Sequence, residues 1–373
     1  MSTTMDDLQR LLEQIAGETG PAAFSSLYAL SDLAGERLKL FLAAWEELPD
    51  ARRRNLIEAL ADLAEASFEV NFDAIYRHSL DDPDDVVRAT AIDGLWENED
   101  PAFIGPFLRL LQADPSAIVR ASAAEALGRY VLAGELEQLD AAIAARVLSE
   151  LLTRFYMADE MTSVRRRAIE SAAYACVPEV SKALEMAYYD DDETMQASAV
   201  FGMGRSCDRR FRAIVLKELE NASPAMRYEA ARASGELGLR QAVPILAQLI
   251  EDADIQIHEA SIWALGQIGG PDAKRILGDA YADADEVTVD AIDEAMAEIA
   301  LQEGSLDLTL YEVDQEAADE LSGDETLDDE LMDDDLSDDD LPDEELWGED
   351  EDEEGEEETD DELLDDDWDS EDR

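Results

Sequence analysis

Positive charge is scarce in this sequence. Its 373 residues include 94 Asp and Glu but only 28 Lys and Arg, so the formal net charge at pH 7 is −66. A protein that binds the phosphates of DNA or RNA needs a basic face. The first 300 residues and the remainder are both net negative, so we expect no nucleic-acid partner.

Cysteines, long apolar runs and a basic leader are missing too. Two cysteines in the whole chain argue against a disulfide scaffold and fit a reducing compartment. No run approaches the roughly 18 apolar residues that cross a bilayer, so we expect no membrane partner. The opening MSTTMDDLQRLLEQIAG is acidic and amphipathic, unlike a signal peptide. The expected location is therefore cytoplasmic.

One pattern recurs along the chain. An acidic or amide residue is followed, six positions later, by a polar anchor with an aliphatic residue before it and alanines after it at helical spacing. The anchors stand at residues 88, 120, 165, 196, 227, 258 and 290, at intervals of 32, 45, 31, 31, 31 and 32. A further copy aligns Arg53 with the anchor. A period near 31 residues is typical of a repeat protein.

Each copy predicts an amphipathic helix. Positions −1, +3 and +7 from the anchor are apolar or small, which places them on one stripe of the helix. Glycines at +8 and +11, among them Gly235, Gly238, Gly266 and Gly269, are expected to end it. A second apolar run precedes each copy, so the unit is a helical hairpin that buries both faces only by stacking. We predict an all-α fold, a right-handed α-solenoid of about seven to eight hairpins.

The repeat resembles a known family. The D-x5-R spacing and the strings VRASAAEALG, MRYEAARASGELG and HEASIWALGQIG are similar to HEAT-like repeats, in particular the phycobilin-lyase type. The resemblance covers roughly residues 50–300. It implies a ladder of hydrogen bonds between neighbouring repeats, which weakens at Gln196, His258 and Asp290. The residues at the ladder positions are Asp82, Arg88, Asp114, Arg120, Asp159, Arg165, Asn221 and Arg227.

Residues for catalysis are few. Deoxyhypusine hydroxylases, which are HEAT-like enzymes, bind two irons with several His-Glu pairs, whereas this chain has one such pair, His258-Glu259, and one other histidine, His78. Cys176 and Cys207 fall at equivalent places in consecutive repeats where later repeats carry glycine, so we interpret them as small packing residues. We expect no catalytic residue, metal or cofactor.

The outward face of the anchor helices would line the groove of such a solenoid. In the early repeats this face is acidic, with Asp93, Glu125 and Glu170 at position +5. Further along it becomes aromatic and basic, and such residues dominate protein–protein contacts. The alternative is that Phe201 and Trp263 pack under a neighbouring repeat. The candidate groove residues are Arg166, Phe201, Arg205, Tyr228, Arg232 and Trp263.

The last part of the chain differs in composition. Residues 301–373 hold 39 acids and one base, and such charge density predicts disorder. Apolar residues dispersed among acids are typical of short binding motifs, and the candidates here are Leu346, Trp347, Leu363, Leu364 and Trp368.

These observations predict four segments along the chain. They are an N-terminal amphipathic helix and linker (1–20), the solenoid (21–300), a short extended segment or linker (301–314) and a disordered acidic tail (315–373). The 45-residue interval predicts either a loop insertion or a longer helix from about 137 to 156.

The functional hypothesis is a non-enzymatic scaffold or adaptor. Its groove would bind one protein partner, and its tail would bind a basic partner or the groove of the same chain. The alternative, which the resemblance implies, is a bilin-lyase-like enzyme subunit or a chaperone-type subunit. The oligomeric state stays open.

Overall fold

The computed structural model describes residues 5–17, 24–206, 208–302 and 304, all of which lie in the first of two units, Met1–Leu308 and Thr309–Arg373. The described residues form helices and no strands, which confirms the all-α prediction. The acidic tail lies outside them. The early helices are α1 (Met5–Gly17), α2 (Phe24–Leu27), α3 (Gly35–Glu47), α4 (Asp50–Ala66), α5 (Asp73–Ser79) and α6 (Asp85–Asp93). The later ones are α7 (Ile104–Ala113), α8 (Ala117–Glu135), α9 (Ala141–Tyr156), α10 (Thr162–Ala172), α11 (Pro178–Tyr188), α12 (Glu193–Arg205), α13 (Arg212–Glu218), α14 (Pro224–Glu236), α15 (Val243–Leu249), α16 (Ile255–Ile268), α17 (Gly270–Ala280) and α18 (Glu286–Gln302).

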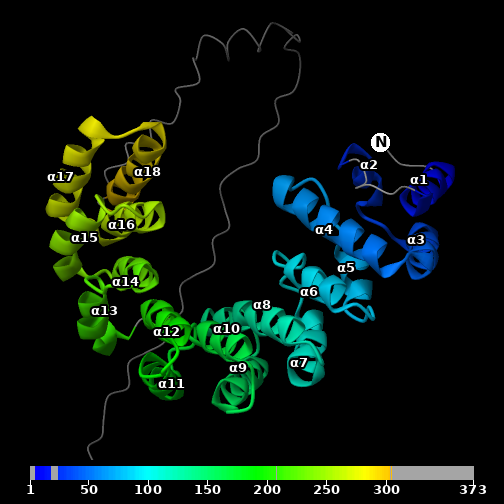
Figure 1. Ribbon diagram of the computed structural model, residues 1–373, viewed down its shortest axis with the longest axis horizontal. Helices are drawn as coiled ribbons and strands as arrows, with labels where there is room; N and C mark the ends of the chain where they lie inside the picture. The colour runs from blue at the N-terminus through cyan, green and yellow to red at the C-terminus, as the bar shows by residue number, and fades with distance from the viewer. Residues whose placement is uncertain (1–4, 18–23, 207, 303, 305–373) are drawn as a thin grey trace, which may run out of the picture. The chain divides into compact units, whose positions relative to one another are not determined.

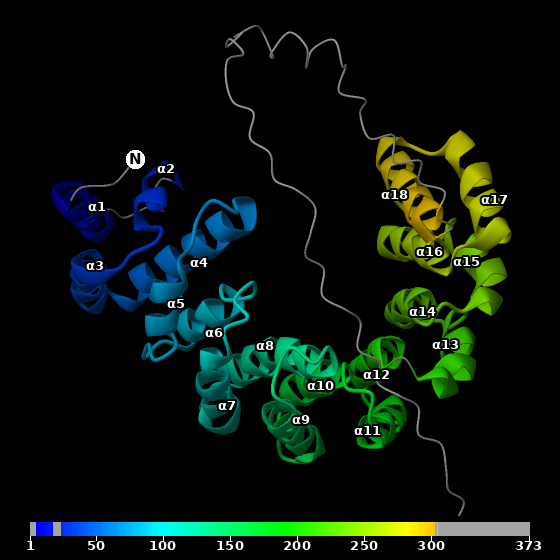
Figure 2. The same ribbon diagram turned by 180° about the vertical axis from the view of Figure 1, so that it is seen from behind.

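The helices form two rows. From α5 onward each odd-numbered helix pairs with the next even-numbered one, and the even-numbered helices also pack on one another in chain order. In Figures 1 and 2 the even-numbered helices form the inner row of a curved stack and the odd-numbered ones form the outer row. The predicted solenoid of helical hairpins is confirmed, and the anchor helices are its inner row.

The long interval between anchors is filled by helix. The inner helix α8 continues to Glu135, and the outer helix α9 spans Ala141–Tyr156. Both are longer than their neighbours, so the extra residues lengthen one hairpin and add no long loop.

The N-terminal helix α1 buries Leu8, Leu11, Leu12 and Ile15 along one face.

Glycines inside the inner helices allow a close approach of the next helix. A Cβ added at Gly204 would lie 2.8 Å from the Cα of Ala233, and one added at Gly266 would lie 2.9 Å from the Cα of Ala295. Gly235 has the same relation to α16. The expectation that Gly235 and Gly266 end their helices is wrong, because both lie within helices and serve packing. Gly238 and Gly269, which have positive φ angles, are the ones that follow the helix ends.

The hydrogen-bond ladder joins neighbouring hairpins. Arg88 Nε and Nη2 each donate to a carboxylate oxygen of Asp114 at 2.8 Å, while its Nη1 donates to the carbonyl oxygen of Asp82 at 2.8 Å. The carboxylate of Asp114 also accepts the backbone N–H of Ser116 at 2.9 Å, at the start of α8. Arg88 therefore connects the turn before α6 to the turn before α8, the next inner helix.

The ladder differs from the predicted one at a single rung. Arg120 pairs with Glu160 at 2.7 Å, whereas Asp159 is exposed. The expectation for Asp159 is wrong because the turn after the long helix α9 places the buried carboxylate one residue later. The longer Glu side chain also accepts the N–H of Met161 at 2.8 Å.

Later rungs are weaker or are made by other groups. Arg165 lies 3.5 Å from Asp190, and Arg227 pairs with Asp252 at 3.0 Å and donates to the carbonyl oxygen of Asn221 at 3.0 Å. The backbone N–H of Asp254 and the Arg227 guanidinium keep the pKa of Asp252 below its usual range. Gln196 bonds only to the carbonyl oxygen within its own repeat, at 2.7 Å, among its described contacts.

Replacing Gly266 by Ala should destabilise the fold by about 1–3 kcal/mol, because the new methyl group overpacks the contact with Ala295. Gly278→Ala is the matched control. It also lies in a helix, but its added Cβ would meet nothing within 4 Å, so it should be neutral or stabilising by up to about 1 kcal/mol. Chemical denaturation followed by circular dichroism measures both. Equal effects of the two substitutions would contradict the packing role of Gly266.

Replacing Arg88 by Met should cost about 3–5 kcal/mol, because it leaves the carboxylate of Asp114 buried without its cation. The control is Arg275→Met in the exposed Arg275–Asp279 pair, which should cost less than about 1 kcal/mol. The free energies of unfolding of the two variants test this prediction. A small loss of stability in Arg88→Met would show that the Arg88–Asp114 pair contributes little.

Candidate protein-binding surface

The predicted groove residues all lie on the inner row of helices. Arg166 is on α10, Phe201 and Arg205 are on α12, Tyr228 and Arg232 are on α14, and Trp263 is on α16. Their side chains are half-buried. Successive inner helices pack side by side, so these residues follow one another along one face, and we call it the inner face.

The arginines on this face are engaged within the protein. The guanidinium of Arg232 lies 4.2 Å from the centre of the Trp263 ring. Arg205 lies 4.5 Å from the Phe201 ring centre and 3.8 Å from a carboxylate oxygen of Glu236. Such cation–π contacts orient both partners. This face is therefore aromatic, but its arginines are engaged within the protein and are not free to attract an acidic ligand.

Arg166 is also held by neighbouring side chains. Its Nε donates to the hydroxyl oxygen of Ser198 on α12 at 2.8 Å, and its Nη2 lies 3.7 Å from a carboxylate oxygen of Glu170. The positive charge of Arg166 is thus partly neutralised by an acid one turn along the same helix.

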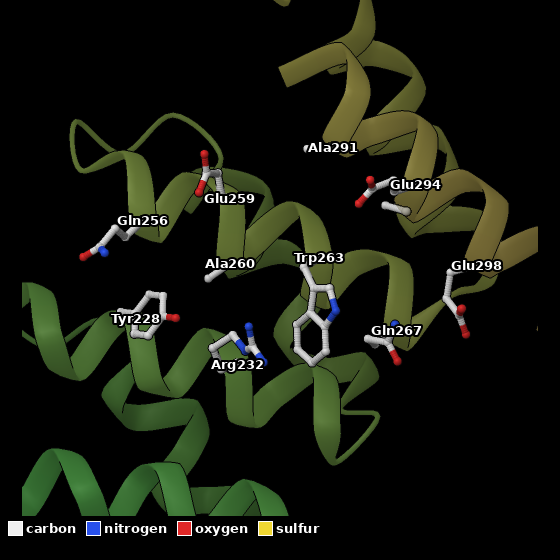
Figure 3. A pocket seen from close by; sticks show the side chains of 11 residues that line it. Tyr228, Arg232, Gln256, Glu259, Ala260, Trp263, Gln267, Ala291, Glu294 and Glu298 are labelled. Atoms are coloured by element: carbon white, nitrogen blue, oxygen red, sulfur yellow. The ribbon is translucent and has the colours of Figure 1, made fainter. Parts of the chain in front are cut away.

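A hollow of about 520 Å³ lies between α14, α16 and α18, and we call it the C-terminal hollow. Figure 3 shows Trp263 near its middle, Tyr228 and Arg232 from α14 on one side, and Glu294 and Glu298 from α18 on the other. The remaining lining residues are Gln256, Glu259, Ala260, Gln267, Ala291 and Ala295. Three glutamates thus accompany one arginine, and that arginine already lies over Trp263.

A second hollow of about 520 Å³ lies on the inner face among α6, α8 and α10, and we call it the N-terminal hollow. It contains Trp96, whose side chain is 52% exposed, beside Asp93 and Glu125. Of its two arginines, Arg129 donates to the carbonyl oxygen of Asn98 at 3.0 Å, and Arg167 pairs with Glu125 at 3.2 Å. The two hollows share a tryptophan, carboxylates and arginines that are already engaged.

Several residues of these hollows were missed in the sequence. Trp96 stands at position +8 of its repeat, just after the end of α6, where the next five repeats carry glycine or alanine. Glu294 lies on α18, which forms one wall of the C-terminal hollow. The +7 and +8 positions of each repeat would have revealed Trp96, whereas Glu298 gives no signal in the repeat pattern.

The carboxyl group of Glu229, on α14, has a raised pKa. Burial, together with the nearby carboxylates of Glu170 and Glu236, raises the pKa of Glu229 to about 7, against the opposing effect of Arg232 and Arg205. The inner face therefore contains an acid that titrates near neutral pH.

Metal-binding and nucleophilic groups are sparse in the described part of the chain. It holds no group of three or more His, Cys, Asp or Glu residues that could hold a metal ion. The ring nitrogens of His258 bond to the carbonyl oxygen of Ile250 and, at 3.2 Å, to the hydroxyl of Thr288. The thiol of Cys176 donates to the carbonyl oxygen of Ser206 at 3.6 Å, and Cys207 is not among the described residues.

The predictions of a binding motif in the tail and of no membrane partner remain. The tail motif of Leu346, Trp347, Leu363, Leu364 and Trp368 lies outside the described residues. Among the helices that the structure describes, none has the length and apolar character needed to span a membrane.

Replacing Glu229 by Gln should change how stability depends on pH. The carboxyl group ionises near pH 7 in the folded chain and near its ordinary pKa of 4.5 in the unfolded one, so the unfolded state gives up its proton first and stability falls as pH rises between these values. The variant lacks this loss and should melt a few degrees higher than the native chain at pH 8, with a smaller difference at pH 5. Melting temperatures across this range test it, and parallel profiles would refute the raised pKa.

Parts of the chain are similar to known proteins. The family of HEAT repeats matches residues 76–154 and 212–297. No curated protein matches the chain. The YibA protein of Escherichia coli is 16% identical over 65% of this chain and 95% of its own, with a TM-score of 0.39. Human deoxyhypusine hydroxylase is 16% identical over 79% of this chain and 96% of its own, with a TM-score of 0.31.

Yeast importin-β (Kap95p) is 13% identical over 79% of this chain, with a TM-score of 0.47, and the match covers 46% of the importin. The two stretches that match the family model include the helices from α7 to α9 and from α13 to α18 almost in full. Over these stretches the chain consists of HEAT repeats.

Proposed function

We propose that the chain is a non-enzymatic adaptor whose inner face binds a protein partner through a basic segment. The observation that carries this proposal is the shared composition of the two hollows. Each presents a tryptophan and carboxylates, and the arginines of both, one in the C-terminal hollow and two in the N-terminal hollow, are already engaged within the chain.

The chemistry of the hollows suits a protein ligand. Tryptophan, tyrosine and arginine are the residues that most often contribute strongly to protein–protein binding. The hollows are open depressions without a set of catalytic groups in the described residues, so they fit side chains of a partner better than a reacting substrate. Carboxylates at the rim favour a partner of opposite charge and raise its rate of association.

The acidic tail would also favour a basic partner. Residues 315–373 carry about half of the chain's net negative charge, which would attract a basic partner over long distances at low salt. The alternative occupant of the inner face, the LWGEDE segment of the tail, is disfavoured because Glu259, Glu294 and Glu298 surround Trp263 and would repel its carboxylates.

Capture of partners from native lysate by the full-length chain tests the proposal. The inner-face variant replaces Trp96 and Trp263 by Ala, and its matched control replaces the exposed outer-row residues Tyr156 and Tyr189. Loss of two strong contacts, each worth more than about 1 kcal/mol, predicts a drop in captured partner of about tenfold or more for the inner variant. A drop confined to the control would refute binding at the inner face.

A further inference from the structure

The C-terminal hollow contains an aromatic ring in a fixed position. A Cβ at Gly235 would lie 2.7 Å from Cζ3 of Trp263, so the ring packs directly on the backbone of α14. The Arg232 guanidinium lies over the same ring at 4.2 Å. Trp263 is nevertheless only half-buried, and the rest of its surface faces the hollow.

Carboxylates stand around the exposed part of this ring. Glu259 on α16 and Glu294 on α18 are exposed, and Glu298 on α18 is half-buried. Figure 3 shows them on the sides of Trp263 that Arg232 does not occupy. Within the described part of the chain neither Glu259 nor Glu294 forms an ion pair, so both are available to a ligand.

We propose that the C-terminal hollow binds an arginine side chain of the partner's basic segment. This inference rests on the proposed function and names the anchor of the partner. The guest guanidinium would stack against the open part of Trp263 and donate to Glu259 and Glu294. A guanidinium fits better than an ammonium because it is planar, stacks on aromatic rings and donates two parallel hydrogen bonds to a carboxylate.

The geometry also explains why the chain supplies Arg232. This arginine fixes the orientation of the indole from one side, and the ring can then present its remaining surface without rearrangement.

Three fluorescein-labelled peptides test the proposal with the full-length chain at a salt concentration that screens distant charges. The first is RGRGRGR. The second carries citrulline, which has the shape of arginine without its charge, at every arginine position. The third carries lysine at those positions. We expect the arginine peptide to bind, the citrulline peptide to bind at least tenfold more weakly, and the lysine peptide about threefold more weakly.

Variants locate the site. Trp263→Ala and the double variant Glu259→Gln, Glu294→Gln should each weaken binding of the arginine peptide about three- to tenfold. The matched control, Glu46→Gln with Glu47→Gln, removes two exposed carboxylates of α3 and should leave the affinity unchanged. Melting temperatures of all variants confirm that each is folded.

Three other outcomes would contradict the proposal. Weakening by Trp96→Ala but not by Trp263→Ala would reject the C-terminal hollow while the inner face remained the binding surface. A second outcome is that the control Glu46→Gln with Glu47→Gln weakens peptide binding as much as Glu259→Gln with Glu294→Gln does, while Trp96→Ala and Trp263→Ala leave it unchanged. This would reject both this inference and the proposed function. Competition by the peptide EELWGED, which is the sequence of residues 344–350, would assign the hollow to the chain's own tail instead.

Discussion

Every part of the inner face depends on the close approach of each inner helix to the next. Gly204, Gly235 and Gly266 lack the methyl group that would strike the following helix. The neighbouring helices therefore stand near enough for side chains at one position of successive repeats to touch. Arg232 reaches the ring of Trp263 across this contact. Helix packing thus sets the spacing of the groups that line the two hollows.

The ladder adds a second constraint and has an electrostatic consequence. Most rungs use an arginine to join the turns before two successive inner helices, as Arg88 does with Asp114. The arginines of the inner face are engaged as well, by rings or by neighbouring acids. Since so few basic residues exist in the chain, little positive charge remains to offset the carboxylates. The acidic character of the hollows follows from this distribution, and not from acidity concentrated at one site.

The repeat period was sufficient to predict the helices and their pairing into hairpins, and the resemblance to HEAT-like repeats implied which helices form the inner row. Finer features depended on geometry that a period does not contain. A shift of one residue in a turn exchanged Asp159 for Glu160 in the ladder. The predicted column of groove residues includes Arg232 and Trp263, which lie on one face, but their mutual contact depends on the packing of α14 against α16. The position of Glu294 beside them depends on the packing of α18, which no single repeat could indicate.

The central claim is that the inner face receives the partner. Carbodiimide labelling of carboxyl groups in the full-length chain, with and without its bound partner, measures this directly by mass spectrometry. The account predicts that the partner lowers labelling at Glu125, Glu259 and Glu294 and leaves the exposed Glu47 and Glu179 unchanged. Protection of Glu47 and Glu179, with unchanged labelling of the three inner-face glutamates, would contradict it.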